Sequence, residues 1–303
     1  MIKNRILTIN QIIESENKFI SKFSQGEILK IAGKRIADYL EDNFHKYQIF
    51  FICGRGNNGN DGIEASKILT KKKIKNIVYE IKKEKNDKKL NKFLNLLNKS
   101  NLIIDCIFGT GLNREVSGIE KQIIDKLNNS KKKIISIDIP SGVNGDNGII
   151  GSSAVNSNFT LAMGFYKPAH FLLPSKKYCG KVNLLDLKLQ VPKKSNPKIS
   201  LINKSYFKNH MPEFGIDINK YDRGHVLILG GEMSGASRIV SIASRKIGSG
   251  LATIAVPEEY LKFYSGIEPG TILTIFKLDI LKKKNVLVIG PGLGKTFDKN
   301  LLL

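Results

Sequence analysis

Residues 47–62, YQIFFICGRGNNGNDG, lead from a short apolar run into a glycine-rich turn. The run is rich in β-branched and aromatic residues and ends at Gly54, which predicts a buried strand followed by a turn into a helix. Strands that alternate with helices predict an α/β fold, a three-layer αβα sandwich with a mostly parallel sheet. The alternation continues downstream, with predicted helices at about 61–69, 88–98 and 118–128 and predicted strands at 76–81, 102–108 and 133–139.

The flanking segments extend this pattern. Residues 24–44, SQGEILKIAGKRIADYLEDNF, place apolar side chains at helical spacing, and Ser24 with Glu27 predicts a capping box at the helix start. Two later apolar segments, FTLAMGF at 159–165 and GKVNLLDL at 180–187, predict further strands. We therefore expect these residues to belong to one α/β domain.

The chain has 303 residues, enough for two domains. Residues 191–200, VPKKSNPKIS, combine two prolines with polar residues and lack periodicity, so we predict one domain at 1–195 and another at 196–303. The second region repeats the alternation, with a helix predicted at about 235–247 and strands predicted at HVLILGG, LATIAVP and NVLVIG. It stops after a glycine-rich turn, which predicts a partial α/β domain.

The composition limits the classes of function. A net charge of +22 suggests nucleic-acid binding, but 42 of the 49 basic residues are lysines spread along the chain. Nucleic-acid readers rely on arginine for bidentate and stacking contacts, so we expect no nucleic-acid partner. Three scattered cysteines offer neither a disulfide framework nor a zinc site, and no apolar run is long enough to span a membrane. We expect a cytoplasmic protein without a membrane partner.

The glycine-rich turn carries the strongest local signal for binding. Between a strand and a helix, glycines let backbone N–H groups approach an anion, and the helix N-terminus adds partial positive charge. Residues 54–62 therefore predict a phosphate site, although they lack the Lys-Ser/Thr ending of a P-loop. The alternative is a structural turn with Asp61 as the helix N-cap.

Polar residues also follow the next two predicted strands. Asp105 lies late in one strand and precedes the loop 109–115, and Asp138 and Ser141 lie late in the next. Because the carboxyl ends of parallel strands line one crevice, we expect these side chains to meet the loop 57–61 there. Each alone has the alternative role of a helix cap. Together they offer carboxylate, amide and hydroxyl oxygens, which suit an alkali or alkaline-earth ion better than zinc.

The other reactive side chains fit structural roles. Cys53 and Cys106 lie within predicted buried strands, where a free cysteine usually packs as a small apolar residue. The four histidines share no ligand spacing. Lys167 follows a predicted strand, and we expect it to lie in a solvated loop rather than to reach a phosphate in the crevice.

The motifs GRGNNGNDG, DCIFGTGLNREVSG and SIDIPSGVNGDNG, in this order and spacing, resemble those of the NAD(P)H-hydrate epimerase family. The resemblance covers about residues 8–190 and includes ILKIAGKRIA, FTLAMGFYKPAHFLLP and GKVNLLDL. Members interconvert the R and S forms of hydrated NADH or NADPH, which carry a hydroxyl on the reduced nicotinamide ring. The resemblance implies a Rossmann-like fold, this substrate and one potassium ion (K⁺) per epimerase domain.

The resemblance also implies roles for single residues. Asp138 would lie at the reacting ring as the catalytic residue, and Asn58, Asp105 and Ser141 would hold potassium. The implied dinucleotide-binding residues of this region are Asn57, Asn58, Gly59, Asn60, Asp61, Gly109, Thr110, Gly111, Leu112, Asn113, Arg114, Glu115 and Asp138.

One position departs from the family pattern. The family loop usually reads NNGGDG, and here Asn60 replaces the second glycine. Asparagine tolerates a positive φ better than most residues, so we expect the loop to keep its shape. If the family's glycine contacts phosphate through its backbone, affinity falls.

The second region resembles the ADP-dependent NAD(P)H-hydrate dehydratase, a ribokinase-like domain often fused behind the epimerase. The segments that carry the resemblance are NKYDRGHVLILGGEMSGAS, SGLATIAVP and IGPGLGK, and they imply that Ala236 and Gly292 contact the hydrated dinucleotide. The family's nucleotide-binding segment and catalytic aspartate lie beyond these residues. We therefore expect dehydratase activity, with ADP or ATP, only in a full-length form, and incomplete packing of this region here.

These expectations combine into a function. The chain is predicted to be an isomerase of nicotinamide-nucleotide repair, in which Asp138 acts as general acid and base on the hydroxyl of the ring. The alternative is a non-catalytic nucleotide-binding module that uses the same crevice. A sugar or cofactor kinase ranks last, because its catalytic turn is missing from these residues. A homo-oligomer is compatible with all of these hypotheses.

Overall fold

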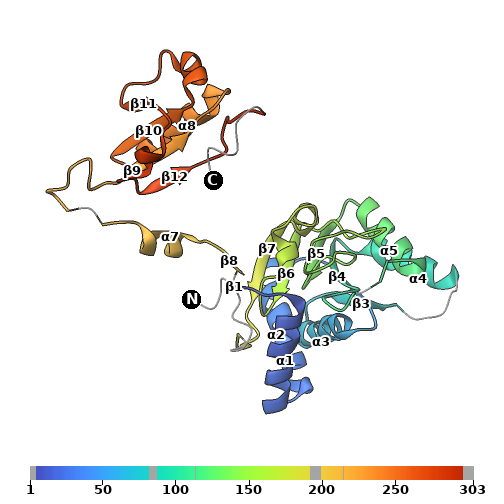
Figure 1. Ribbon diagram of the computed structural model, residues 1–303. Coiled ribbons are helices and arrows are strands. Elements are labelled where there is room, and N and C mark those ends of the chain that lie inside the picture. Colours follow the sequence, from blue (N-terminus) through green and yellow to red (C-terminus); the bar gives the residue numbers. More distant parts are fainter. Residues whose placement is uncertain (1–4, 82–86, 113, 192–198, 214, 296–303) are drawn as a thin grey trace. The chain divides into compact units, whose positions relative to one another are not determined.

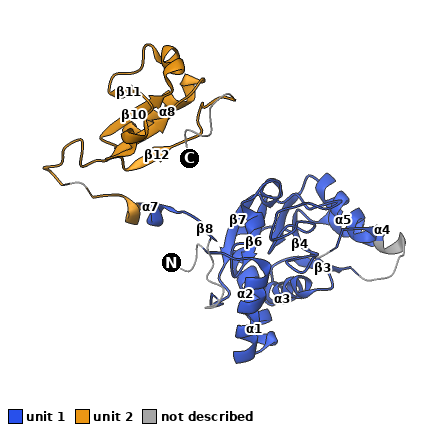
Figure 2. Ribbon diagram, viewed as in Figure 1, with its two compact units in different colours: residues 1–207 blue, residues 208–303 orange. Residues whose placement is uncertain are grey.

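The computed structural model describes residues 5–81, 87–112, 114–191, 199–213 and 215–295. The chain divides into two compact units, residues 1–207 and 208–303 (Figure 2). The predicted boundary at 195 lies outside the described residues, and the assignment of functional domains to the units stays a prediction. No described helix has both the length and the apolar character needed to cross a membrane.

The first unit is built on a six-stranded parallel sheet with the strand order β3-β2-β4-β5-β6-β7 (Figure 1). Its strands are β2 (Ile49–Cys53), β3 (Asn76–Glu80), β4 (Leu102–Cys106), β5 (Lys133–Ile137), β6 (Phe159–Met163) and β7 (Lys181–Leu185). A separate antiparallel pair joins β1 (Arg5–Ile6) to β8 (Ile199–Ser200). The predicted α/β class with a parallel sheet is confirmed.

The helices follow the predicted alternation. They are α1 (Ile9–Lys22), α2 (Gln25–Phe44), α3 (Asn57–Lys71), α4 (Asp87–Lys99), α5 (Gly118–Asn129), the 3₁₀ turn η2 (Pro168–His170), α6 (Lys176–Cys179) and α7 (Lys204–His210), of which α1, η2, α6 and α7 are additions to the prediction. Ser24 accepts a hydrogen bond from the Glu27 backbone N–H at 3.1 Å, as the predicted cap requires. The Glu27 carboxylate pairs with Lys30 instead of returning to the cap.

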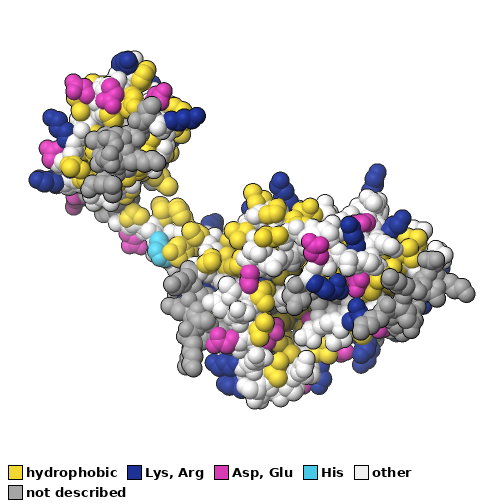
Figure 3. Space-filling model, turned by 45° about the vertical axis from the view of Figure 1, so that its right-hand side comes forward, with side chains coloured by type: hydrophobic (Ala, Val, Ile, Leu, Met, Phe, Trp, Pro, Cys, Tyr) yellow, Lys and Arg dark blue, Asp and Glu magenta, His cyan; other side chains and the backbone are white. Residues whose placement is uncertain are grey.

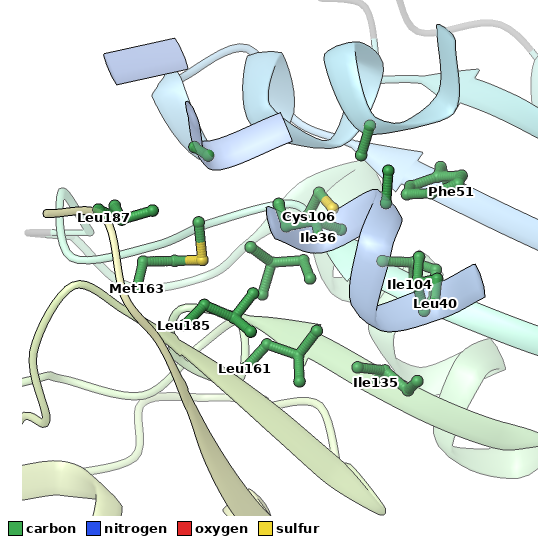
Figure 4. Close-up of a cluster of buried hydrophobic side chains, with 14 of the residues drawn as sticks. Ile36, Leu40, Phe51, Ile104, Cys106, Ile135, Leu161, Met163, Leu185 and Leu187 are labelled. Atoms are coloured by element: carbon green, nitrogen blue, oxygen red, sulfur yellow. The ribbon is translucent and has the colours of Figure 1, made fainter. Parts of the chain in front are cut away.

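Two hydrophobic layers enclose the sheet. On one face, Phe51 of β2 packs in a cluster with Ile36 and Leu40 of α2 and with residues of α3 (Figure 4). On the other face, Phe50 of β2 packs with Phe93 of α4 and residues of α5. All five residues of β2 are therefore buried, which explains why its sequence is continuously apolar rather than alternating.

The strand order places a topological switch point beside β2. The chain leaves β2 for β3 on one side and then crosses to β4 on the other. The turns that follow β2 and β4 therefore diverge and leave a crevice at the carboxyl ends of these strands, the position at which open α/β sheets bind ligands.

The glycines of the turn after β2 are needed for close backbone packing. A Cβ atom on Gly54 would lie 1.9 Å from the Ile107 carbonyl oxygen, and one on Gly59 would lie 1.9 Å from the Gly54 carbonyl oxygen. Real Cβ atoms never come so close, so only glycine lets the turn lie against the strand ends.

The start of α3 differs from the prediction. The helix begins at Asn57, with Gly56 as an extended N-cap that provides no side-chain bond. Residues 57–61 therefore form its first turn, and the alternative role of Asp61 as N-cap was wrong. Asn60 is helical and donates its N–H to the Gly56 carbonyl at 3.2 Å, so tolerance of a positive φ is not what preserves this turn.

The second unit has its own parallel sheet, in the order β11-β10-β9-β12. It contains β9 (His225–Leu229), α8 (Ser234–Lys246), β10 (Leu251–Val256), η3 (Glu258–Tyr264), β11 (Thr271–Ile275), η4 (Leu278–Leu281) and β12 (Val286–Val288), of which β11 was not predicted. Its buried cluster is small, and Ile239, Ile247, Ile272 and Leu287 are between 43% and 71% exposed. Large apolar side chains of this unit are therefore exposed among the residues that the structure describes.

Alanine substitution tests the close packing of the turn. Alanine normally stabilises a helix by about 1 kcal/mol relative to glycine, but Gly59→Ala is expected to destabilise the protein by about 1–3 kcal/mol through overpacking. Gly26→Ala is the matched control, because that glycine also lies in a first helical turn and its Cβ would meet only Ser24 Oγ, at 3.7 Å. Urea denaturation measures both; equal stability of the two variants would contradict the packing argument.

Candidate active site

A cleft of about 610 Å³ lies at the switch point, within the size range of small-molecule sites. Its walls come from α1, α2, the first turn of α3 and the segment after β4, together with Asp138, Met163 and Lys167. All of its lining residues belong to the first unit. Asp138 lines this cleft together with the turn 57–61, as predicted, whereas Asp105 and Ser141 are buried and do not line it.

Asp105 organises the strand ends beneath the cleft. Its side chain is fully buried at the end of β4 and accepts hydrogen bonds from both hydroxyl neighbours, Ser136 Oγ and Ser141 Oγ, each at 2.6 Å. The backbone N–H groups of Ser141 and Ile107 add bonds of 3.0 and 3.2 Å. Burial raises the pKa of Asp105, and these bonds oppose the rise because they stabilise the charged form.

The Asn58 side chain, in the first turn of α3, is held by two backbone carbonyl groups. Its Nδ2 donates to the carbonyl oxygens of Phe108, at 2.9 Å, and Ile137, at 3.2 Å. Two carbonyl acceptors fix the orientation of the amide, since only the nitrogen can donate. The buried Oδ1 atom is left without a hydrogen-bond partner among the described residues. An oxygen of this kind is the expected partner of a cation or donor that is not part of the chain.

The Asn58, Asp105 and Ser141 side chains meet around Phe108. Ser141 Oγ accepts from the Phe108 N–H at 2.9 Å, and Asn58 contacts the Phe108 carbonyl. In the described part of the chain, no three His, Cys, Asp or Glu side chains are close enough to hold a metal ion. A cation here would therefore be held by amide, hydroxyl and carbonyl oxygens, the donor set that suits an alkali ion.

Asp138 directly follows β5 rather than lying within the strand. Its φ is +70°, in the left-handed region that non-glycine residues rarely adopt. The predicted strand to residue 139 is therefore two residues too long, because this turn ends β5 at Ile137. The turn aims the carboxylate at the cleft, where it lies 3.3 Å from the position that a Cβ on Gly109 would take.

Lys167 forms a buried ion pair with Asp138. The lysine is 1% exposed, its Nζ contacts Asp138 Oδ1, and it donates a second bond to the Met163 carbonyl at 2.8 Å. The expectation of a solvated loop at Lys167 was therefore wrong. The sequence lacks a signal for this pairing, because the two residues lie on different strand ends and meet only in the folded sheet.

His170 joins the backbones of Lys167 and Asp138 through two hydrogen bonds. Its Nδ1 accepts the N–H of Lys167 at 3.1 Å, so its Nε2 carries the hydrogen and donates to the Asp138 carbonyl at 2.8 Å. Burial and the nearby Lys167 charge lower the pKa of His170 to about 4. The ring is neutral at physiological pH and acts as a fixed link between Asp138 and Lys167.

Most residues implied for dinucleotide binding reach the cleft. Gly59 packs against Gly54 instead, and Glu115 is exposed away from the cleft. Asn113 lies outside the described residues. Those that line the cleft are Asn57, Asn58, Asn60, Asp61, Gly109, Thr110, Gly111, Leu112, Arg114 and Asp138. Which of them contact a ligand stays a prediction.

The two residues implied in the second unit lie beside each other. A Cβ on Gly292 would be 3.4 Å from Ala236 Cβ, and the Gly292 carbonyl accepts the Met233 N–H at 3.0 Å. Their proposed contact with a dinucleotide is not tested by this geometry.

Sequence reasoning missed Glu16 of α1. The helix is capped by Thr8, whose hydroxyl accepts from the Gln11 N–H while Gln11 bonds back to the cap, and this Thr-x-x-Gln pattern was the available signal. Glu16 lines the cleft beside the residues discussed above. Burial and the Asp138 charge raise its pKa, and Lys167 opposes that rise.

Asp61 is the most strongly perturbed carboxyl of the cleft. Burial raises its pKa well above the ordinary value, and the negative charges of Asp138 and Glu16 raise it further. Asp61 therefore favours the protonated form at pH values where an exposed aspartate is ionised.

The positive charge of the chain is not concentrated at one site on the visible surface. Figure 3 shows Lys and Arg side chains scattered among acidic, apolar and neutral groups on that face. At the cleft itself, Arg55 and Arg114 both pair with Glu120, at 3.4 and 3.6 Å. The cleft is therefore a mixed-charge site rather than a basic groove.

The six-stranded parallel sheet with a cleft at its switch point defines an α/β protein of the open-sheet class. The family described as "YjeF-related protein N-terminus" matches residues 25–92 and 71–169. An NAD(P)H-hydrate epimerase of Oenococcus oeni is 30% identical over 165 residues, which cover 50% of this chain and 79% of that protein. The chain belongs to the NAD(P)H-hydrate epimerase family.

Longer relatives match both units. A bifunctional NAD(P)H-hydrate repair enzyme of Coxiella burnetii is 30% identical over 322 residues, 96% of this chain. The chain spans 66% of the length of that protein. A ribokinase-like superfamily protein of Enterococcus faecalis overlaps 33% of this chain with 23% identity and a TM-score of 0.28. The ribokinase likeness of the second unit stays a prediction.

The Asp138–Lys167 pair makes a testable contribution to stability. Lys167→Met leaves a buried carboxylate without its partner, which is expected to destabilise the protein by about 3–5 kcal/mol at neutral pH. The double variant with Asp138→Asn removes both charges and is expected to recover much of that loss. Urea denaturation of both variants measures the difference. A double variant no more stable than the single one would show that the charge of Asp138 is not the cause.

Proposed function

We propose that this chain epimerises the hydroxylated carbon of hydrated NADH or NADPH. The single observation that carries the proposal is the Asp138–Lys167 pair inside the switch-point cleft, because a binding module has no need of a buried carboxylate aimed at its ligand. Family membership and the activities for which the relatives are named support it.

The first turn of α3 is proposed to hold the diphosphate of the substrate. Gly56 provides no side-chain cap, so the first backbone N–H groups of a 15-residue helix are free to meet an anion. The exposed Asn57 and Asn60 side chains line the cleft at this turn and add amide donors. The substrate would then extend from this turn toward Asp138.

Asp138 is proposed to exchange a proton with the reacting oxygen. The hydroxyl carbon of the substrate is bonded to the ring nitrogen, whose lone pair assists loss of the hydroxyl or opening of the ring. Either route needs a proton at the oxygen when the bond breaks and removal of a proton when it reforms. Lys167 and His170 hold Asp138 in place for this exchange, through the ion pair and through the backbone bond to its carbonyl.

Potassium is proposed to bind at Asn58 and Ser141. The residues fit, because Asn58 Oδ1 is a buried oxygen without a partner among the described residues and lies beside the Phe108 carbonyl contact. Asp105 is proposed to act mainly by organising this site, since its two oxygens already accept four hydrogen bonds. When bound, the ion would supply positive charge at the diphosphate end of the cleft.

Thermal unfolding tests the cation site without an activity measurement. Potassium chloride is expected to raise the Tm of the protein more than choline chloride at equal ionic strength, because an ion that binds only the folded state stabilises it. Asn58→Ala removes the free oxygen and is expected to abolish the difference between the two salts. A potassium effect that survives in Asn58→Ala would contradict the assignment of this ligand.

Chiral separation of the products tests the reaction itself. The parent protein is expected to convert the R form of hydrated NADPH to an equilibrium mixture, and Asp138→Asn to slow this by about 10²–10⁴-fold, the usual contribution of a general acid–base group. Substrate binding by the variant is measured by calorimetry. Parent-like turnover in Asp138→Asn would reject its role, and binding without turnover in the parent would favour a non-catalytic nucleotide-binding module.

The remaining functional expectations belong to the same proposal. A cytoplasmic location, a homo-oligomeric state and the absence of a nucleic-acid partner stay predictions. So does the lack of dehydratase activity, with ADP or ATP, in the second unit taken alone.

A further inference from the structure

The cleft contains more carboxyl groups than cationic partners. Glu16 of α1, Asp61 of α3 and Asp138 after β5 all line it, and Lys167 is paired with Asp138. Within the described residues, neither Glu16 nor Asp61 makes an ion pair, and the arginines at this cleft are paired with Glu120. Two carboxyl groups thus share the cleft without an ion-pair partner of their own among the described residues.

The surroundings push these carboxyl groups toward different protonation states. Asp138 is matched with an ammonium group, whereas Asp61 meets burial and the negative charges of Asp138 and Glu16, all of which raise its pKa. The pKa of the nearby Cys106 thiol is also raised well above the ordinary value, so this group brings no compensating charge. Such a divergence between neighbouring carboxyl groups is how an acid and a base are separated in one site.

The reaction needs both a proton donor and a proton acceptor, and Asp138 alone does not provide both. A carboxylate in an ion pair accepts protons, yet the departing hydroxyl needs a donor before any proton has been accepted. Asp61 lines the same cleft, and no ion pair to it is present within the described residues.

We propose that Asp61 is the second catalytic carboxyl group of this chain, the proton donor to the departing hydroxyl, and that Glu16 is a positioning residue that keeps Asp61 in its acid form. The inference rests on the proposed epimerase function and deepens it.

The step balances without a redox partner. The carbon–oxygen bond breaks as the ring-nitrogen lone pair forms a carbon–nitrogen double bond, and the oxygen leaves as water with the proton of Asp61. Water then adds to the other face of the same carbon, the double-bond electrons return to nitrogen, and the proton of this water goes to Asp138. Asp61 ends ionised and Asp138 protonated, and exchange with solvent across the open cleft restores both.

The pH dependence of kcat/KM for the full chain tests this assignment. Because the protonated form of Asp61 is the active one, the parent rate is expected to fall as pH rises through the elevated pKa of Asp61. Asp61→Asn is expected to lose about 10²–10⁴-fold in turnover and to lose this alkaline decline. Glu16→Gln removes one negative neighbour, so its decline is expected at lower pH than in the parent. Glu14→Gln, an exposed change on the same helix outside the cleft lining, is expected to match the parent.

Several outcomes overturn the inference. Turnover of Asp61→Asn within a few-fold of the parent would reject Asp61 as donor, and an alkaline decline in Glu16→Gln that coincides with Glu14→Gln would reject the role of Glu16. If the parent epimerises and these variants do not behave as expected, only this inference fails; an inactive parent removes the proposed function with it.

An infrared measurement reports the proton directly and does not need activity. At a pH where exposed aspartates are ionised, the folded parent is expected to show the carbonyl stretch of a protonated carboxylic acid, present in Glu14→Gln and absent in Asp61→Asn. Circular dichroism of each variant verifies that it is folded. A parent spectrum without this band, or a band that survives in Asp61→Asn, overturns the assignment.

Discussion

The buried carboxylate of Asp105 is the interaction on which the site depends. Four donors from β5, from the turn after it and from the chain that follows β4 converge on its two oxygens. A fully buried carboxyl group is costly unless it is satisfied in this way. These hydrogen bonds therefore hold Ser136, Ser141 and Ile107 in fixed positions relative to one another. They join the ends of β4 and β5 into one rigid edge.

The rest of the site is assembled on that edge. The carbonyl groups of Phe108, after β4, and Ile137, at the end of β5, accept hydrogen bonds from the Asn58 amide. These bonds hold the first turn of α3 against the strand ends. Asp138 comes next in the chain, and its left-handed backbone is held by the His170 bond to its carbonyl. Residues from three strand ends thus share one cleft because each is bonded to the backbone of a neighbour.

The sequence predicted the fold well and the chemistry of the site only in part. Strand and helix alternation is a local pattern, and the carboxyl-end rule converts it into a cleft shared by Asn58 and Asp138, with Asp105 buried rather than lining it. The pairing of Lys167 with Asp138 depends on the alignment of β6 beside β5, which no local pattern encodes. The start of α3 was placed four residues late because asparagine and glycine favour turns, and the hydrogen bonds of Asn58 to the Phe108 and Ile137 carbonyl groups override that preference.

The unpaired carboxyl groups of Glu16 and Asp61 lie close enough to Asp138 to be repelled by its charge, and the fold itself does not require this repulsion. A lysine or an apolar residue at Asp61 or Glu16 would relieve the repulsion toward Asp138, and neither side chain makes a described ion pair that helps the packing. Residues that raise the free energy of the folded state without a packing benefit are expected at functional sites. This contrast separates Asp61 from Asp105. Asp105 is fully buried and satisfied by donors of the fold, whereas Asp61 is half-buried in the first turn of α3 and is left to meet a ligand.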